Sequence, residues 1–254
     1  MYGSLKDKVA LVIGGNSGIG KACAHAFAAS GAKVMIGARR EAECGAVVEE
    51  IRAAGGTAAF AKVDVLQESE LEAIVAATVG RFGRLDCAVN SAGIVEDYGP
   101  VHEASGDVCD RMMAVNVRGT LLGMKHQIRQ MLSQGGGSIV NLSSFLGHVG
   151  AMTGSIYVAT KHAVLGLTRA AALNYAKQGI RVNCVAPTTI VGTPMVDYTM
   201  ATYPGLMDPY IADIPMGRPG KTHEVGAAVA WLCSDEASFV TGHSLPVDGG
   251  QLAK

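Results

Sequence analysis

The chain has 254 residues, a length at which an α/β fold can form one domain. Apolar residues make up 49% and charged residues 17%, where roughly a quarter charged is typical, so the composition excludes a disordered chain. The formal charge is −1 and no long run of Lys or Arg occurs, which argues against a nucleic-acid partner. So few charges predict that some apolar surface is buried between copies of the chain.

Cysteine and histidine usage gives no sign of a disulfide framework or a metal site. None of the six cysteines forms a C-x-x-C pair, so we expect reduced, mostly buried thiols in a reducing compartment. The seven histidines do not cluster and H-E-x-x-H is absent, so no metal is expected. The first apolar run, Val9–Ile13, is too short for a signal peptide or a membrane span. The sequence therefore predicts a cytoplasmic protein that does not bind membranes.

Short apolar or β-branched runs alternate with helix-period segments along the whole chain. This alternation predicts parallel strands joined by right-handed crossovers, with helices on both faces. We therefore predict an α/β fold with a single domain over residues 1–254, a Rossmann-like, doubly wound parallel sheet of about seven strands. The expected strands are Lys8–Ile13, Lys33–Gly37, Ala59–Val63, Leu85–Asn90, Ser138–Leu142, Arg181–Ala186 and Ser244–Val247. The expected helices are Gly18–Ser30, Glu41–Ala54, Glu68–Arg81, Gly106–Leu132, Ser155–Lys177 and Thr222–Cys233.

A glycine motif follows the first predicted strand and leads directly into the first helix. It reads Gly14-Gly15-Asn16-Ser17-Gly18-Ile19-Gly20 in a chain that contains 33 glycines. Glycines let the backbone approach a pyrophosphate, and the helix N-terminus offers free N–H groups and a partial positive charge. An ordinary glycine turn is the alternative interpretation, but the position between strand and helix favours a nucleotide site.

The pair Tyr157–Lys161 is the strongest candidate for proton transfer. Tyr and Lys four apart share one face of a helix. An ammonium about 4 Å from a phenol, at an effective dielectric near 20, lowers the phenol pKa by up to about three units. We therefore expect Tyr157 to titrate near the operating pH, where general acid/base catalysis is most effective. A second such pair, Tyr2–Lys6, precedes the first strand and is interpreted as accidental.

Taken in order, these motifs resemble the classical short-chain dehydrogenase/reductase family over nearly the whole chain. Asn90-Ser91-Ala92-Gly93 is similar to its Asn-Asn-Ala-Gly motif, and "SFVTGHSLPVDGG" is similar to its C-terminal strand and tail. The resemblance implies a catalytic tetrad of Asn116, Ser144, Tyr157 and Lys161, in which Ser144 hydrogen-bonds the reacting oxygen. It also implies that Lys161 holds the nicotinamide ribose and that Asn116 positions a water leading protons to Lys161. Ser143 is the neighbouring rival of Ser144, but Gly147, three residues beyond Ser144, favours the latter.

The end of the second strand predicts the choice of cofactor. An NAD enzyme needs a carboxylate there for the ribose 2′-hydroxyl, and this chain has Ala38. Arg39 can pair with a 2′-phosphate, so NADP(H) is expected in preference to NAD(H). Alternatively Arg39 stacks on adenine and discriminates little, and Arg40 assists or faces solvent. The cofactor residues that the resemblance implies are Gly14, Asn16, Ser17, Gly18, Ile19, Gly20, Arg39, Arg40, Asp64, Val65, Asn90, Ala92, Gly93, Tyr157, Lys161, Pro187, Ile190 and Thr193.

Three positions depart from the family pattern. Ile13 replaces a family Thr, Ser91 replaces the second Asn, and Thr188 replaces the Gly after Pro187, in a segment to Thr193 that is one residue longer than usual. The following stretch is rich in Pro, Met and Tyr and predicts a substrate lid over about residues 188–222, with a surface excursion as the alternative. His148 either contacts substrate or is an ordinary loop residue.

The expected function is that of an NADP(H)-dependent oxidoreductase that interconverts a ketone and a secondary alcohol. Reduction of a 3-oxoacyl-[acyl-carrier-protein] is an alternative, but its acidic partner requires a basic patch, for which Arg129 and Arg169 are scattered candidates. A non-catalytic dinucleotide-binding sensor or scaffold is the alternative from another class, and it has no use for Tyr157. The charge-poor face of Ser155–Lys177 predicts a homotetramer or a homodimer.

Overall fold

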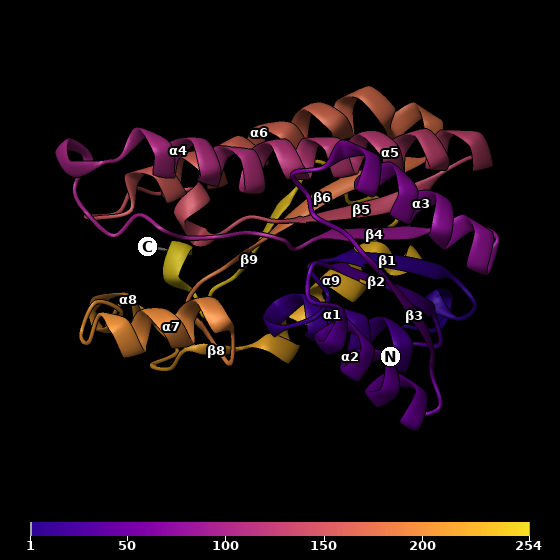
Figure 1. Ribbon diagram of the computed structural model, residues 1–254, viewed down its shortest axis with the longest axis horizontal. Coiled ribbons are helices and arrows are strands. Elements are labelled where there is room, and N and C mark those ends of the chain that lie inside the picture. Colours follow the sequence, from indigo (N-terminus) through magenta and orange to yellow (C-terminus); the bar gives the residue numbers. More distant parts are fainter. Residues whose placement is uncertain (1, 254) are drawn as a thin grey trace.

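The computed structural model describes residues 2–253 and is built around one parallel sheet (Figure 1). Its seven strands lie in the order β3-β2-β1-β4-β5-β6-β9, so the winding reverses between β1 and β4. The predicted Rossmann-like sheet is thereby confirmed. The strands are β1 Val9–Ile13, β2 Lys33–Ala38, β3 Thr57–Lys62, β4 Cys87–Asn90, β5 Gly137–Leu142, β6 Ile180–Pro187 and β9 Ser244–Val247.

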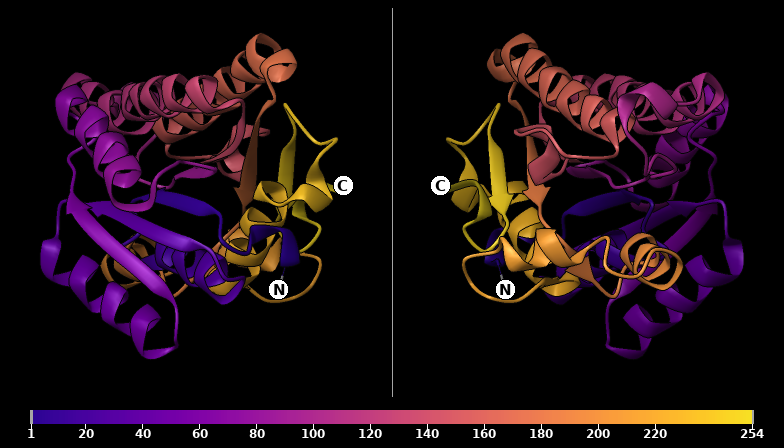
Figure 2. Two further views of the ribbon diagram at one scale, coloured as in Figure 1. Left: turned by 90° about the vertical axis from the view of Figure 1, so that its right-hand side faces the viewer. Right: turned by 90° about the vertical axis from the view of Figure 1, so that its left-hand side faces the viewer.

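Helices cover both faces of the sheet, and each face has its own apolar core (Figures 1 and 2). Along β1, Ala10 and Val12 belong to one core while Leu11 and Ile13 belong to the other, because strand side chains alternate. Within residues 2–253, no helix has both the length and the apolar character that crossing a membrane requires. One face carries α1 Gly18–Ala29, α2 Glu41–Ala53 and α9 Thr222–Cys233; the other carries α3 Glu68–Phe82, α4 Gly106–Met112, α5 Gly119–Gln134 and α6 Ser155–Tyr175.

The predicted helix Gly106–Leu132 is divided by one widened turn. Residues Met113–Arg118 form a π-helix, η3, between α4 and α5, and Asn116 is buried within it. Such turns are rare and frequently accompany functional sites. The spacing of apolar residues continues through this turn, so the sequence pattern does not indicate the π-helix.

The segment 188–222, predicted as a lid, contains structure of its own. It forms α7 Pro194–Thr202, α8 Asp208–Ala212 and a two-stranded sheet of β7 Ile190–Val191 and β8 Gly220–Lys221. Figure 1 shows α7 and α8 beside the carboxyl ends of the strands.

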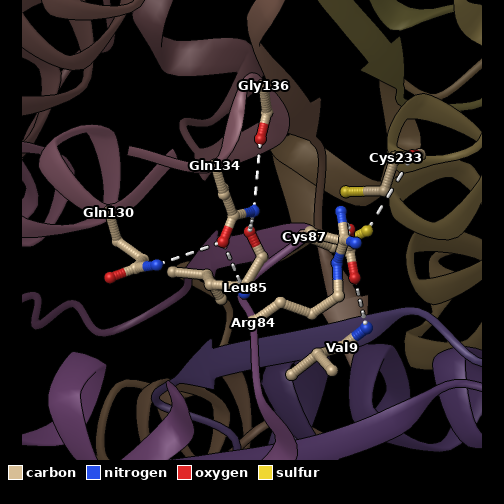
Figure 3. Close-up of polar contacts among 9 residues, drawn as sticks. Val9, Arg84, Leu85, Cys87, Gln130, Gln134, Gly136 and Cys233 are labelled. Carbon is tan, nitrogen blue, oxygen red and sulfur yellow. Dashed lines mark hydrogen bonds and ion pairs between the residues drawn. The ribbon is translucent and has the colours of Figure 1, made fainter. Parts of the chain in front are cut away.

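The start of β4 is fixed by polar contacts from three sides (Figure 3). The Gln134 side chain, at the end of α5, donates to the Leu85 carbonyl at 2.6 Å and accepts from the Leu85 N–H at 3.1 Å. The Asp86 carboxylate accepts from the Val9 N–H at 2.9 Å and pairs with Arg84 at 2.7 Å. This anchoring matters for function because the other end of β4 leads into the Asn90–Gly93 motif.

Replacing Gln134 by Met tests this anchor. The variant loses both bonds to the Leu85 backbone, so its free energy of unfolding in urea should fall by about 1–2 kcal/mol. Gln130→Met is the matched control: Gln130 donates only to Gln134 in Figure 3, and a change within about 0.5 kcal/mol is expected. Equal losses in the two variants would contradict the role given to Gln134.

Candidate active site

A cavity of about 790 Å³ opens at the carboxyl edge of the sheet, where ligands bind in doubly wound folds. Its wall comes from the segments after β1, β2, β3, β4, β5 and β6, together with α6 and α7. Three expected residues, Gly20, Asn90 and Asn116, do not line it. The expected residues that do line it are Gly14, Asn16, Ser17, Gly18, Ile19, Arg39, Arg40, Asp64, Val65, Ala92, Gly93, Ser144, Tyr157, Lys161, Pro187, Ile190 and Thr193.

The glycine motif packs backbone against backbone. Gly14 has φ +82°, and a Cβ there would lie 2.7 Å from the Ala92 nitrogen. A Cβ on Gly20 would lie 2.1 Å from the Gly14 carbonyl oxygen. Ser17 caps α1 without a side-chain hydrogen bond, which leaves the first N–H groups of the helix available toward the cavity. This bare, electropositive cradle fits the pyrophosphate of a dinucleotide.

Two arginines follow β2 at the cavity rim. The Arg40 guanidinium pairs with Glu43 at 2.9 Å and donates to the Ser17 hydroxyl at 3.2 Å. Glu43 also accepts from the Asn16 amide at 2.8 Å. Glu43 thus connects Arg40 to the glycine loop. The sequence analysis does not include Glu43, although the i,i+3 spacing of Arg40 and Glu43 is typical of an ion pair on a helix. Arg39 makes no ion pair within the described residues.

The side chain of Asn90 lies in the core rather than in the cavity. Its amide donates to Gln127 at 3.1 Å and to Asn141 at 2.9 Å, and its oxygen accepts from Gln127 at 2.8 Å. The amide is therefore engaged within the protein, and its contribution to the site is to hold β4 against β5 and α5. The Asn90 side chain does not line the cavity, so a cofactor contact by this residue stays a prediction that concerns its backbone.

Ser144 and Ser143 have different partners. The Ser144 hydroxyl, at the cavity wall after β5, accepts from the Leu146 N–H at 3.2 Å. The Ser143 hydroxyl donates to the Lys161 carbonyl at 3.0 Å, and a Cβ on Gly147 would lie 2.6 Å from it. Ser143 therefore holds α6 to the end of β5, which favours Ser144 as the residue that faces a ligand.

Tyr157 and Lys161 line the cavity from one face of α6, with the Lys161 ammonium 5.3 Å from the centre of the Tyr157 ring. Burial raises the pKa of Tyr157, and the hydrogen bond with Ser144 acts in the opposite direction. Burial also lowers the pKa of Lys161 to about 8, and its ammonium donates to the Leu142 carbonyl at 2.9 Å. The expected lowering of the Tyr157 pKa is not found, because loss of water outweighs the hydrogen bond with Ser144. At pH 7 Tyr157 is protonated.

Asn116 supports the site from the π-helix. Its oxygen accepts from the Ile94 N–H at 2.8 Å, and its amide donates to the Ile94 carbonyl at 2.9 Å and to the Thr160 hydroxyl at 3.2 Å. A Cβ on Gly93 would lie 3.4 Å from the Asn116 oxygen and 3.7 Å from the Lys161 ammonium. Asn116 therefore binds the segment after β4 and lies close to Lys161.

Part of the remaining wall is apolar and aromatic, and Tyr98, Phe145 and Tyr210 belong to it. The rings of Tyr98 and Tyr203 are 4.5 Å apart, and those of Phe145 and Tyr210 are 6.1 Å apart. The predicted lid segment contributes Met195, Leu206, Met207 and Tyr210 to the lining.

Two further expectations concern residues away from this wall. His148 does not line the cavity, and its ring nitrogen lies 2.8 Å from the Ser244 hydroxyl on β9. Across residues 2–253, no cluster of three or more His, Cys, Asp or Glu side chains is arranged to hold a metal ion.

A parallel sheet with a glycine loop at its switch point, and with Ser, Tyr and Lys in one cavity, defines a dinucleotide-dependent oxidoreductase fold. A family model described as enoyl-(acyl carrier protein) reductase matches residues 13–251. The chain belongs to the classical short-chain dehydrogenase/reductase family. Proteins of this family are oxidoreductases that act on CH–OH and C=O groups with nicotinamide dinucleotides.

Three curated relatives cover nearly all of this chain. The 2,5-dichloro-2,5-cyclohexadiene-1,4-diol dehydrogenase of Sphingobium indicum is 45% identical, with 98% of each chain covered. The A-factor type gamma-butyrolactone 1′-reductase of Streptomyces virginiae is 43% identical, covering 98% of this chain and 96% of the relative. The cis-4-hydroxycyclohexanecarboxylate dehydrogenase of Sinomonas cyclohexanicum is 42% identical, with 97% of each covered.

Solved structures agree with the fold. The crystal structure of gox2181 has a TM-score of 0.95 at 33% identity, with 99% of each chain covered. The crystal structure of levodione reductase has a TM-score of 0.91 at 38% identity, with 98% of each covered. The chain thus follows the family fold over its whole described length.

Gly20→Ala tests the backbone cradle. Because the new methyl would meet the Gly14 carbonyl, the loop must shift, and we expect dinucleotide affinity to fall by at least about 10-fold, with a lower melting temperature. Gly80→Ala, in an open position on α3, is the control; it should keep the affinity and gain up to about 1 kcal/mol from helix propensity. Affinity is measured by fluorescence titration. Unchanged affinity in Gly20→Ala would show that the cradle is not needed.

Proposed function

We propose that this chain is an NADP(H)-dependent oxidoreductase that interconverts a cyclic ketone and a secondary alcohol. The observation that supports this most directly is the placement of Ser144, Tyr157 and Lys161 in the same cavity as the glycine loop. The nicotinamide, when bound, supplies or accepts the hydride. The loop from Gly14 to Ile19 would hold its pyrophosphate, and Lys161 its ribose hydroxyls.

The protein groups handle the proton and the developing charge. In reduction, Tyr157 is in its protonated form and gives its proton to the carbonyl oxygen of the substrate. Ser144 hydrogen-bonds the same oxygen as negative charge develops on it. The Lys161 ammonium, 5.3 Å from the Tyr157 ring, stabilises the phenolate that remains. Asn116, bonded to Ile94 and Thr160, would position the water that returns a proton through Lys161.

Two relatives and the cavity wall support a cyclic substrate. The names of the cyclohexadiene-diol dehydrogenase and the hydroxycyclohexanecarboxylate dehydrogenase each describe a six-membered ring that carries a hydroxyl and a second polar group. In this chain, Tyr98, Phe145, Met207 and Tyr210 line the same cavity as Tyr157. Aromatic and methionine side chains make an apolar, adaptable wall that suits a compact ring.

The charges around the cavity do not favour an acyl-carrier-protein substrate. Arg129 and Arg169, the expected basic candidates, do not line the cavity. Arg111 does line it, but it is paired with Glu96 at 2.9 Å, and Asp97 and Asp110 also line the cavity. The charges at this part of the rim are balanced or negative, so they would not attract an acidic partner protein. A sensor or scaffold is also less well supported, because it has no use for Tyr157 and Lys161 together in one cavity.

We also propose that the protein acts in the cytoplasm as a homotetramer or homodimer. All six cysteines are free thiols, which suits a reducing compartment. Leu121 on α5 and Leu173 on α6 are 46% and 85% exposed, so apolar side chains lie on the outer faces of the two long helices. Twofold pairing of these faces would cover them.

The preference for NADP(H) is supported by the end of β2. Ala38 stands where a carboxylate would bind a ribose 2′-hydroxyl and repel a 2′-phosphate. Arg39 and Arg40 line the rim, and Arg40 is already paired with Glu43, so Arg39 is the guanidinium best placed for a phosphate. Stacking of Arg39 on adenine, with little discrimination, is the competing arrangement.

Tyr157→Phe tests the acid/base. The ring is kept and only the hydroxyl is lost, so cofactor binding should survive while kcat falls by roughly 100-fold or more. Tyr2→Phe is the matched control, since Tyr2 belongs to the accidental motif and its hydroxyl donates to the Ala227 carbonyl at 3.4 Å, far along the chain from Tyr157. Near-normal turnover in Tyr157→Phe would defeat the assignment.

The cofactor preference is tested by the double substitution Ala38→Asp with Arg39→Ile. One charge-assisted hydrogen bond is worth about 1.5–3 kcal/mol, so wild type should favour NADP by at least ~10-fold in kcat/KM. The double variant should favour NAD, because it gains a carboxylate and loses the guanidinium. A wild-type preference for NAD, or equal ratios in both proteins, would show that the end of β2 does not select the cofactor.

A further inference from the structure

One side chain from outside the predicted lid segment hydrogen-bonds to α7. Of the residues Pro194–Thr202 that form this helix, only Thr199 is buried, with 4% of it exposed. Within residues 2–253, the hydrogen bonds of α7 stay inside the segment 188–222 with one exception. The Thr199 hydroxyl lies 3.3 Å from the hydroxyl of Tyr98, in the loop after β4. Tyr98 therefore makes the polar contact that connects α7 to the rest of the protein.

Tyr98 is the donor between these two hydroxyls. The Thr199 hydroxyl donates its own hydrogen to the Met195 carbonyl, one turn earlier in α7, at 2.9 Å. It can therefore only accept from Tyr98, whose hydroxyl also lies 3.3 Å from the Val95 carbonyl. The Tyr98 ring adds an apolar contact, because its centre lies 4.5 Å from that of Tyr203, directly after α7. One residue thus contacts this helix through both its hydroxyl and its ring.

The loop that carries Tyr98 is bound to the start of α6. The Asp97 carboxylate accepts from the Ile156 N–H at 2.7 Å, in the first turn of that helix. A helix leaves its first N–H groups unpaired, and a carboxylate is favoured at this end. On the other side of Tyr98, the Gly99 carbonyl accepts from the Gly154 N–H at 3.2 Å. Tyr98 therefore stands between two residues that are fixed to the helix of the proposed acid/base.

These contacts join two parts of the cavity wall. Figure 1 shows α6 above the sheet and α7 below it, beside the carboxyl ends of the strands. Tyr98 lines the cavity, and so does Tyr157 of α6. The residues of α7 that line it are Pro194, Met195, Val196 and Thr199. A displacement of α7 would therefore change the space in which a substrate meets Tyr157.

We propose that Tyr98 is a positioning residue for the substrate, because it holds α7 in place over the cavity through Thr199 and Tyr203. The Tyr98 hydroxyl takes no part in proton transfer. An element that covers a site encloses the bound substrate, so the loss of a contact that holds it weakens substrate binding more than the chemical step. This inference rests on the proposed function and adds to it the contact that encloses the substrate.

Two substitutions remove this hydrogen bond from opposite sides. Tyr98→Phe removes the donor and keeps the ring contact with Tyr203, and Thr199→Val removes the acceptor. In each variant the KM for cyclohexanone with saturating NADPH should rise by about 3- to 10-fold, the effect of one lost hydrogen bond, while kcat stays within about twofold. The double variant should resemble the single variants, because both changes remove the same bond. Tyr198→Phe is the matched control: Tyr198 also lies on α7, is 58% exposed and does not line the cavity, so its substitution should leave KM unchanged.

Limited proteolysis of the NADPH complex tests the hold on α7 without a substrate. Chymotrypsin can cleave after Leu206 and Tyr210, whereas residues 182–217 contain no Lys or Arg at which trypsin could cleave. Chymotrypsin should cut these two sites at least about threefold faster in Tyr98→Phe and Thr199→Val, because the segment opens more often. Trypsin digestion, the melting temperature and NADPH affinity should match wild type in both variants, and Tyr198→Phe should match wild type throughout.

Three results would overturn the inference. The first is chymotrypsin cleavage at the wild-type rate in both variants, and the second is an unchanged KM in variants that are active. The third is a fall in kcat at unchanged KM in Tyr98→Phe, which would place its hydroxyl among the reacting groups. If wild type binds NADPH but reduces neither cyclohexanone nor other cyclic ketones, the proposed function fails, and the proteolysis still decides whether Tyr98 holds α7.

Discussion

A buried network of side-chain amides holds together the elements that carry the site. Asn90 on β4 hydrogen-bonds both Gln127 on α5 and Asn141 on β5. The Asn141 amide also donates to the Thr168 hydroxyl on α6 at 3.0 Å. Each group is fully buried or nearly so, and an unpaired amide at this depth would be strongly destabilising. The network therefore sets the relative positions of β4, β5 and α6, from whose ends and faces Gly93, Ser144 and Tyr157 reach the cavity.

Burial has two opposite consequences for the chemistry of this cavity. It raises the pKa of Tyr157, which favours the protonated phenol. It also lowers the pKa of Lys161 to about 8, so the neighbouring ammonium is only moderately favoured over its neutral form at neutral pH. If Tyr157 gives up a proton, as proposed above, the negative charge would lie beside Lys161 and favour the charged form of Lys161.

The sequence predicted the sheet well because its signals are local and strong. All seven expected strands are present within about two residues of their predicted ends, since continuous apolar runs between glycine turns leave little choice. The π-turn at Asn116 could not be predicted, because it changes the hydrogen-bond pattern and not the apolar period. The helices α7 and α8 were missed because prolines and methionines in that stretch suggested a loop.

The residues predicted from the positions of their motifs line the cavity, whereas the hydrogen bonds of a buried side chain could not be predicted from the sequence. The glycine loop, Ser144, Tyr157 and Lys161 reach one cavity, because their order along a doubly wound sheet fixes the edge at which they meet. The hydrogen bonds of the Asn90 side chain could not be predicted, because its partners Gln127 and Asn141 come from elements 37 and 51 residues away. Hydrogen bonds between amides this far apart in the sequence produce no recognisable spacing of residues.

The C-terminal turn explains how the fold accommodates Thr188 in place of the family glycine. Gln251, 6% exposed, accepts from the Thr188 hydroxyl and donates to the Tyr210 carbonyl at 3.3 Å and to Asp213 at 3.2 Å. One side chain thereby joins the segment after β6 to the α8 region, whose Tyr210 ring packs on Phe145 next to Ser144. The hydroxyl that replaces the glycine is thus part of a connection between the two sides of the cavity. The shape of the substrate wall therefore depends on the tail of the chain as well as on the segment that lines it.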